Sequence, residues 1–142
     1  MVPEINIWAV LIATVSSMVV GVIWYAKPVF GNWWQRAAKI SDESMSSSNP
    51  YPIIATIVVS FITAIVLAGA AAIAQHFYGG NFVFNALLTA LILWGGFTAA
   101  RFVTHDAFEG RPKMLTLLTI SHELVTVLVM ALIIGLFGIS AA

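Results

Sequence analysis

The chain has 142 residues, which suits one domain and is too short for two of ordinary size. Apolar residues make up 61% of it and charged residues 8%, against about 45–50% and about 25% in soluble domains, so a soluble fold could not bury this much apolar surface. Six basic residues balance six acidic ones, which gives no electrostatic case for nucleic-acid binding. The absence of cysteine excludes disulfides, thiolate metal sites and cysteine nucleophiles.

Four apolar runs, each long enough to cross a bilayer, follow one another along the chain. A bilayer core of about 30 Å needs about 20 apolar residues when a helix rises about 1.5 Å per residue. We therefore predict one all-α membrane domain, a four-transmembrane-helix bundle with spans at about residues 5–25, 52–76, 82–104 and 114–138. The first run follows Glu4 and has no small-residue cleavage site, so we expect it to stay attached and not to act as a secretory signal.

The segment between the first two runs divides into two parts. Its first part carries apolar residues at helical spacing, with polar residues opposite them: Phe30, Trp33, Trp34, Ala37 and Ile40. This pattern predicts a short amphipathic helix at about residues 30–40, lying in the inner headgroup layer; an aromatic anchor without regular structure is the alternative. The polar, serine-rich residues 41–51 predict a cytoplasmic linker.

The basic residues give the chain a direction in the membrane. All of them follow the first span or surround the end of the third: Lys27, Arg36, Lys39, Arg101, Arg111 and Lys113. Because positive residues close to span ends are retained in the cytoplasm, we expect both termini on the non-cytoplasmic side. Tryptophan and tyrosine residues gather near both predicted membrane surfaces, as is typical of interfacial belts.

Two short segments resemble a known family: residues 21–33, which read GVIWYAKPVFGNW, and residues 108–112, which read FEGRP. They are similar to the domain of unknown function family 1761, a family of small bacterial membrane proteins. The resemblance covers essentially the whole chain, and it implies four hydrophobic segments with a polar loop after the first, in the bacterial cytoplasmic membrane. It implies no activity. The sequence departs from the family at residues 120–123, so the resemblance implies no role for Glu123.

Small, polar or ionisable residues of all four predicted spans lie at a similar depth. Counted inward at about 1.5 Å per residue, they are about 12–17 Å from the cytoplasmic ends. They are Ser16, Ser17, Ser60, Thr63, Gly95, Gly96, His122 and Glu123. On the last span, Thr116, Thr119, Glu123 and Thr126 recur at steps of three and four and so share one face. Packing is the alternative role for the serines, threonines and glycines, because small residues let helices approach closely.

Glu123 stands apart because a carboxyl group at mid-membrane costs about 2.5–3.5 kcal/mol on insertion scales. Intramembrane ionisable groups are therefore candidates for function, and either His122 or Arg101 could stabilise this one. We predict a binding site formed by Glu123, His122, Ser17, Ser60, Thr63, Thr119, Thr126 and Arg101. We expect no cofactor and no metal, since the pair His105 and Glu109 lacks a third ligand.

A charged cluster precedes the last span and is predicted to be structural. Asp106, Glu109 and Arg111 are close enough in sequence to form local salt bridges that order the loop. Gly110 would supply an unusual backbone dihedral, and Pro112 would start the last helix.

These features lead to two hypotheses of function. In the first, a homo-oligomer binds or passes a small solute or ion through the polar layer, with Glu123 as the carrier; four short helices rarely enclose a pathway alone. In the second, the protein is a non-catalytic accessory or scaffold that docks onto another membrane protein. We expect no enzyme activity, because His122-Glu123 lacks a second histidine four residues after the first, and no G-x-S-x-G motif is present.

Overall fold

The structure is a computed structural model that describes residues 4–41 and 49–139. Within these ranges the chain is helical and contains no strand, which confirms the predicted all-α bundle. Its helices are α1 (Ile7–Trp24), the π-helix η1 (Lys27–Gly31), α2 (Asn32–Ala38), α4 (Tyr51–Tyr78), α5 (Phe82–Leu93), the π-helix η2 (Trp94–Ala99), α6 (Ala100–Phe108) and α7 (Lys113–Phe137). Most of the predicted linker, residues 42–48, lies outside the described residues.

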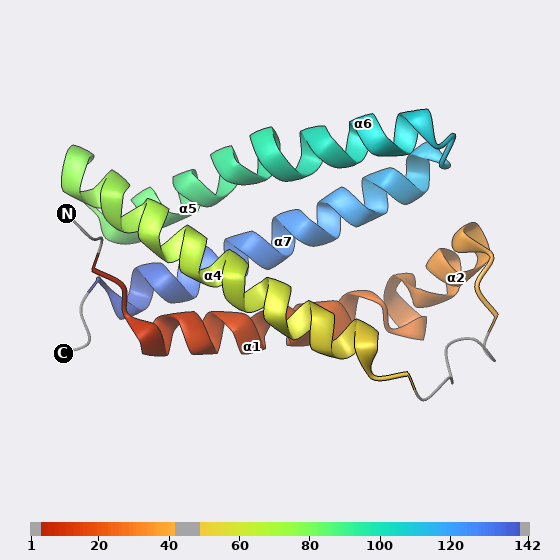
Figure 1. Ribbon diagram of the computed structural model, residues 1–142, viewed down its shortest axis with the longest axis horizontal. Coiled ribbons are helices and arrows are strands. Elements are labelled where there is room, and N and C mark those ends of the chain that lie inside the picture. Colours follow the sequence, from red (N-terminus) through yellow and green to blue (C-terminus); the bar gives the residue numbers. More distant parts are fainter. Residues whose placement is uncertain (1–3, 42–48, 140–142) are drawn as a thin grey trace.

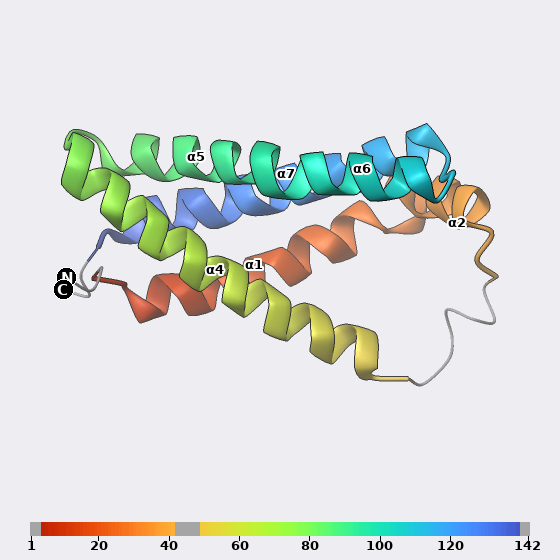
Figure 2. The ribbon, with the colours of Figure 1, turned by 45° about the horizontal axis from the view of Figure 1, so that its top comes forward.

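Four of the helical segments are long and apolar enough to cross a membrane: α1, α4, the continuous run Phe82–Phe108, and α7. The third segment passes residue 104, where the prediction ended it, because the polar residues that follow remain helical in α6. α7 lies between α1 and the α5–α6 segment and packs against both (Figure 1). α4 packs on α1 and α5 near the 79–81 turn and diverges from α6 and α7 towards Tyr51 (Figure 2).

The core is built from small side chains in the half of the bundle next to the 79–81 turn. Its buried members include many alanines: Ala9, Ala13, Ala64, Ala68, Ala71, Ala86, Ala90 and Ala131. Small residues let helices approach closely without large side chains between them. At Gly135 two helices come very close, since a Cβ atom there would lie 2.7 Å from the Cα atom of Val83. The other half of the bundle, where α4 diverges, has room for a cavity.

Side-chain hydrogen bonds close the end of the bundle where α1 begins and α7 ends. The Asn6 carboxamide oxygen caps α1 by accepting from the amides of Trp8 at 3.1 Å and Ala9 at 3.3 Å. The Asn6 amide nitrogen donates to the Phe137 carbonyl at 3.5 Å. Buried Asn85 donates to the Gln75 carboxamide at 2.5 Å and so fixes the neighbouring turn. The start of α1, the end of α7 and the 79–81 turn therefore share one end.

The opposite end is held by an ion pair in the 108–112 turn. Asp106 is buried; its carboxylate lies 3.2 Å from the Arg111 guanidinium and accepts a 2.6 Å hydrogen bond from the Thr116 hydroxyl. Gly110 has a φ of 66°, a conformation that favours glycine. These contacts confirm the predicted local salt bridge and the dihedral role of Gly110. Helix α7 starts at Lys113, directly after Pro112.

Candidate binding site

A cavity of about 600 Å³ lies between α1, α4 and α7, in the half of the bundle where α4 diverges. This volume falls within the range of about 300–1,000 Å³ that is typical of small-molecule sites. His122 and Glu123 reach it from the middle of α7, Ser17 and Gly21 from α1, and Ser60 from α4. Apolar side chains make up much of the remaining wall, among them Met18, Val22, Val59, Val127 and Met130.

Most of the residues predicted to form the site lie together around this cavity: Ser17, Ser60, Thr63, His122, Glu123 and Thr126. Thr119 is not part of the lining, and its hydroxyl donates to the Leu115 carbonyl of its own helix at 3.0 Å. Arg101 is exposed on α6 and does not line the cavity either. The α5–α6 segment contributes no lining residue, because α7 lies between it and α1 (Figure 1). The cavity is therefore lined by residues of three of the four predicted spans.

Two further polar side chains that line the cavity, those of Thr56 and Tyr25, were missed by the sequence analysis. Thr56 precedes Ser60 and Thr63 by four and seven residues, so helical spacing on α4 could have indicated it. Tyr25 was assigned only to the interfacial aromatic belt. Its ring centroid lies 5.1 Å from that of His122, and its position depends on the turn after α1, which hydropathy does not predict.

His122 is the most enclosed ionisable group of the site. Its Nδ1 atom lies 3.4 Å from the Glu123 carboxylate, and the exposed fractions of the two side chains are 14% and 35%. Its Nε2 atom is buried and has no hydrogen-bond partner among the described residues. Gly21 faces this nitrogen, since a Cβ atom there would lie 3.7 Å from it. Because buried polar atoms are normally paired, His122 Nε2 is a position at which a ligand would gain a contact.

The cavity hydroxyls use their protons within their own helices. Ser17 donates to the Thr14 carbonyl at 2.7 Å, Thr63 to Val59 at 2.9 Å, and Thr126 to His122 at 2.9 Å. A hydroxyl that donates in this way keeps its lone pairs as acceptors. Together with the Glu123 carboxyl oxygens, these atoms make the cavity rich in acceptors. That arrangement suits a cation or a hydrogen-bond donor.

Over the part of the chain that the structure describes, no group of three or more histidine, aspartate or glutamate side chains is placed to hold a metal ion. Among the described residues, His122 and Glu123 therefore have no third ligand of this kind near them.

Comparison with known proteins identifies the family. Residues 8–135 match the family model described as "Protein of unknown function (DUF1761)". No curated protein and no solved structure gives a match. Because the matched residues run from the first turn of α1 to the last turn of α7 and include all four long helices, the chain belongs to the DUF1761 family of proteins of unknown function.

Proposed function

We propose that this multi-pass membrane protein binds a small cation or hydrogen-bond donor in the cavity between α1, α4 and α7. We further propose that a homo-oligomer passes this solute across the bacterial cytoplasmic membrane without catalysis, with both termini on the non-cytoplasmic side. One observation carries the proposal: Glu123 and His122 face a cavity whose hydroxyls offer acceptors, at the middle of a membrane-spanning helix.

The surroundings of Glu123 favour a positively charged ligand. Buried apolar walls such as Val127 and Met130 lower the local dielectric constant, so the attraction between a carboxylate and a cation is stronger there than in water. The Nδ1 atom of His122, 3.4 Å away, helps to orient the carboxyl group. The Nε2 atom of the same ring adds a second point of contact for a ligand or a proton.

Self-association is part of the proposal because one chain offers only three cavity-lining helices. The first half of α4 diverges from α6 and α7 (Figure 2). It exposes large apolar side chains, including those of Ile53, Ile54 and Ile57. A second copy packed against this half would add the walls that a pathway needs.

The test is flux into liposomes that contain the purified protein. Proton, alkali-cation and methylammonium uptake would be measured for the wild type, Glu123→Gln and the control Glu109→Gln, which changes an exposed carboxyl in the 108–112 turn. We expect the wild type and Glu109→Gln to move at least one of these ions faster than empty liposomes. Glu123→Gln should fall to the empty-liposome rate, because it keeps the shape of the side chain and removes its charge.

Wild-type flux at the empty-liposome rate for every ion would contradict transport and favour the accessory hypothesis. Equal flux through the wild type and Glu123→Gln would contradict a role for the carboxyl. A third variant, Glu123→Leu, separates function from folding. If it melts at the wild-type temperature or above, Glu123 is not a structural contact, since leucine removes a group whose insertion is unfavourable.

A further inference from the structure

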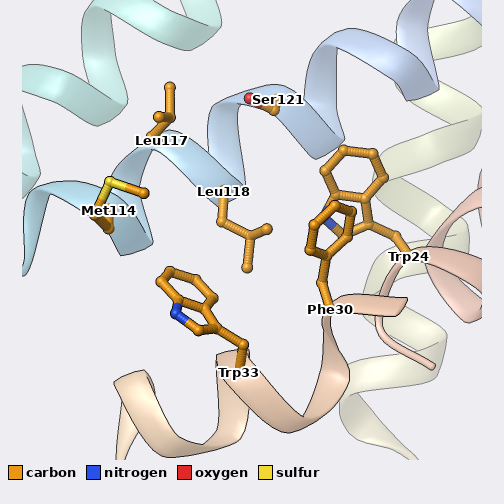
Figure 3. A pocket seen from close by; sticks show the side chains of 7 residues that line it. All are labelled: Trp24, Phe30, Trp33, Met114, Leu117, Leu118 and Ser121. Atoms are coloured by element: carbon orange, nitrogen blue, oxygen red, sulfur yellow. The ribbon is translucent and has the colours of Figure 1, made fainter. Parts of the chain in front are cut away.

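A second hollow, separate from the polar cavity, opens between the segment after α1 and the start of α7. It measures about 440 Å³ and is lined by Trp24, Phe30 and Trp33 on one side and by Met114, Leu118 and Ser121 on the other (Figure 3). We call it the apolar groove. Trp24 also contacts His122 edge to face, at a ring-centroid distance of 5.9 Å, so this ring pair lies between the groove and the polar cavity. The groove is therefore distinct from the polar cavity.

The depth of the groove matches one leaflet of a bilayer. Lys113 is the first residue of α7, and Ser121 lies eight residues further along the helix. At about 1.5 Å per residue, the groove extends about 12 Å from the end of the span towards its middle. This is the region that lipid acyl chains occupy, and the groove presents them with aromatic and aliphatic side chains.

Basic residues are close in sequence to residues that line the groove. Lys113 directly precedes Met114, and Arg36 lies one helical turn after Trp33 on α2. Arg36 and Lys39 also line a polar hollow on the surface of α2. One short helix thus carries an apolar wall and cationic side chains together. Basic pockets beside membrane helices attract anionic lipid headgroups.

An indole nitrogen in the groove wall has no acceptor. Trp24 Nε1 is buried and makes no hydrogen bond to any residue that the structure describes. Buried N–H groups are normally paired, so this one favours a ligand that carries an acceptor. The Phe30 ring packs against the indole at a centroid distance of 4.7 Å and lies beside its nitrogen (Figure 3).

We infer that the apolar groove binds one acyl chain of an anionic phospholipid from the leaflet next to α2. The phosphate binds near Arg36 and Lys113, and the acyl chain packs against Trp24, Phe30 and Trp33. This inference does not depend on the proposed transport function, because neither Glu123 nor any other polar-cavity residue takes part.

Tryptophan quenching by brominated lipids tests the inference. The protein would be placed in phosphatidylcholine liposomes that contain a small, equal mole fraction of either brominated phosphatidylglycerol or brominated phosphatidylcholine. We expect the anionic lipid to quench the wild type at least twofold more strongly. Trp24 and Trp33 both line the groove, so Trp33→Phe should lower this difference and the double variant Trp24→Phe/Trp33→Phe should lose most of it. Trp8→Phe is the matched control and should keep it, because Trp8 is exposed at the opposite end of α1.

The charge requirement is tested separately. The double variant Arg36→Gln/Lys113→Gln should remove the preference for the anionic lipid, whereas Arg101→Gln, which changes an exposed cation on α6, should not. Ser121→Phe fills the groove from α7 and should lower quenching by both lipids. Circular dichroism confirms that each variant is folded. Equal quenching of the wild type by the two lipids, or a preference that survives both Trp24→Phe/Trp33→Phe and the double charge variant, would overturn the inference.

Discussion

Buried polar residues of this protein differ in whether they have partners. Asp106 has two, the Arg111 guanidinium and the Thr116 hydroxyl, which fits a structural role at the 108–112 turn. His122 Nε2 and Trp24 Nε1 have none among the described residues. A buried polar atom without a partner costs about 1–3 kcal/mol, so a ligand that pairs with it gains more than one that binds where pairing is complete. The cavity and the groove are therefore better candidates for ligand binding than the 108–112 turn.

Two threonines on the same helix should differ in their contribution to stability. Thr116→Val removes a 2.6 Å hydrogen bond to the buried Asp106 carboxylate, and we expect it to lower the free energy of unfolding by about 1–3 kcal/mol. Thr119→Val removes a bond to the Leu115 carbonyl, which remains a helix acceptor, and should cost less than about 1 kcal/mol. Thermal unfolding of both variants in the same detergent measures the difference. Equal destabilisation would show that the Asp106 contact adds nothing.

The sequence could identify most of the polar residues that line the cavity, because helical spacing and depth require no tertiary information. The α7 stripe placed Glu123 and Thr126 on one face, and both line the cavity. It could not show where the cavity ends. On α7 the lining begins at His122, where the Tyr25 ring packs, and Thr119 lies beyond this point. Which residues of the α7 stripe line the cavity therefore depends on the contact between Tyr25 and α7. Helical spacing alone does not describe that contact.

At the scale of elements, the third membrane segment departs from the regular helix that its hydropathy predicts. Its middle, η2, is π-helical, and at its start the Trp94 indole donates to the Ile120 carbonyl of α7 at 2.8 Å. Gly95 and Gly96 lie in this π-helix, and a Cβ atom on either would meet nothing within 4 Å. They are not close-packing positions. Hydropathy indicates the length of a span, but not whether its turns are α-helical or π-helical. The π-helix therefore could not be predicted.

The segment after α1 shows the same limit. The structure contains the short helix α2 at Asn32–Ala38, and its location in the headgroup layer stays a prediction. Before it, η1 makes a tight turn in which a side chain at Gly31 would overlap the Tyr25 carbonyl. The apolar spacing indicated the helix; the turn depends on backbone packing that spacing does not describe.

The contact between α5 and α7 should be sensitive to a single methyl group. In Gly135→Ala the new Cβ atom would lie 2.7 Å from the Val83 Cα atom, so the two helices must separate. We expect a loss of about 1–3 kcal/mol in the free energy of unfolding, as for other overpacked cores. Gly95→Ala is the control, because its Cβ atom has open space. Thermal melting that ranks Gly95→Ala as the less stable variant would contradict this account of the contact.

For the whole molecule, the four spans were predicted, because a bilayer requires long apolar helices. The divergence of α4 from α6 and α7 was not predicted. The sequence of α4 nevertheless contains a signal for it. Its second half is rich in alanine, with Ala68, Ala71 and Ala72 buried, and its first half carries β-branched residues such as Ile53 and Ile57 that stay exposed. Small residues permit close packing and large ones hold helices apart, so the helix packs at one end only.

The orientation of the bundle in the membrane is the remaining prediction for the whole molecule. The turn at 79–81 shares one end with the start of α1, and the 108–112 turn and α2 lie at the other, with most of the basic residues (Figure 1).

Because the chain has no cysteine, single cysteines can be introduced without background. We expect Tyr78→Cys to react with a membrane-impermeant maleimide in intact cells, and Glu109→Cys to react only after the membrane is opened, since basic loops are retained in the cytoplasm. Val125→Cys, in the middle of α7, is the control and should react in neither condition, because hydrocarbon excludes the charged reagent. Labelling of Glu109→Cys alone in intact cells would reverse the orientation, and labelling of both turn positions from outside would contradict the passage of Phe82–Phe108 through the membrane.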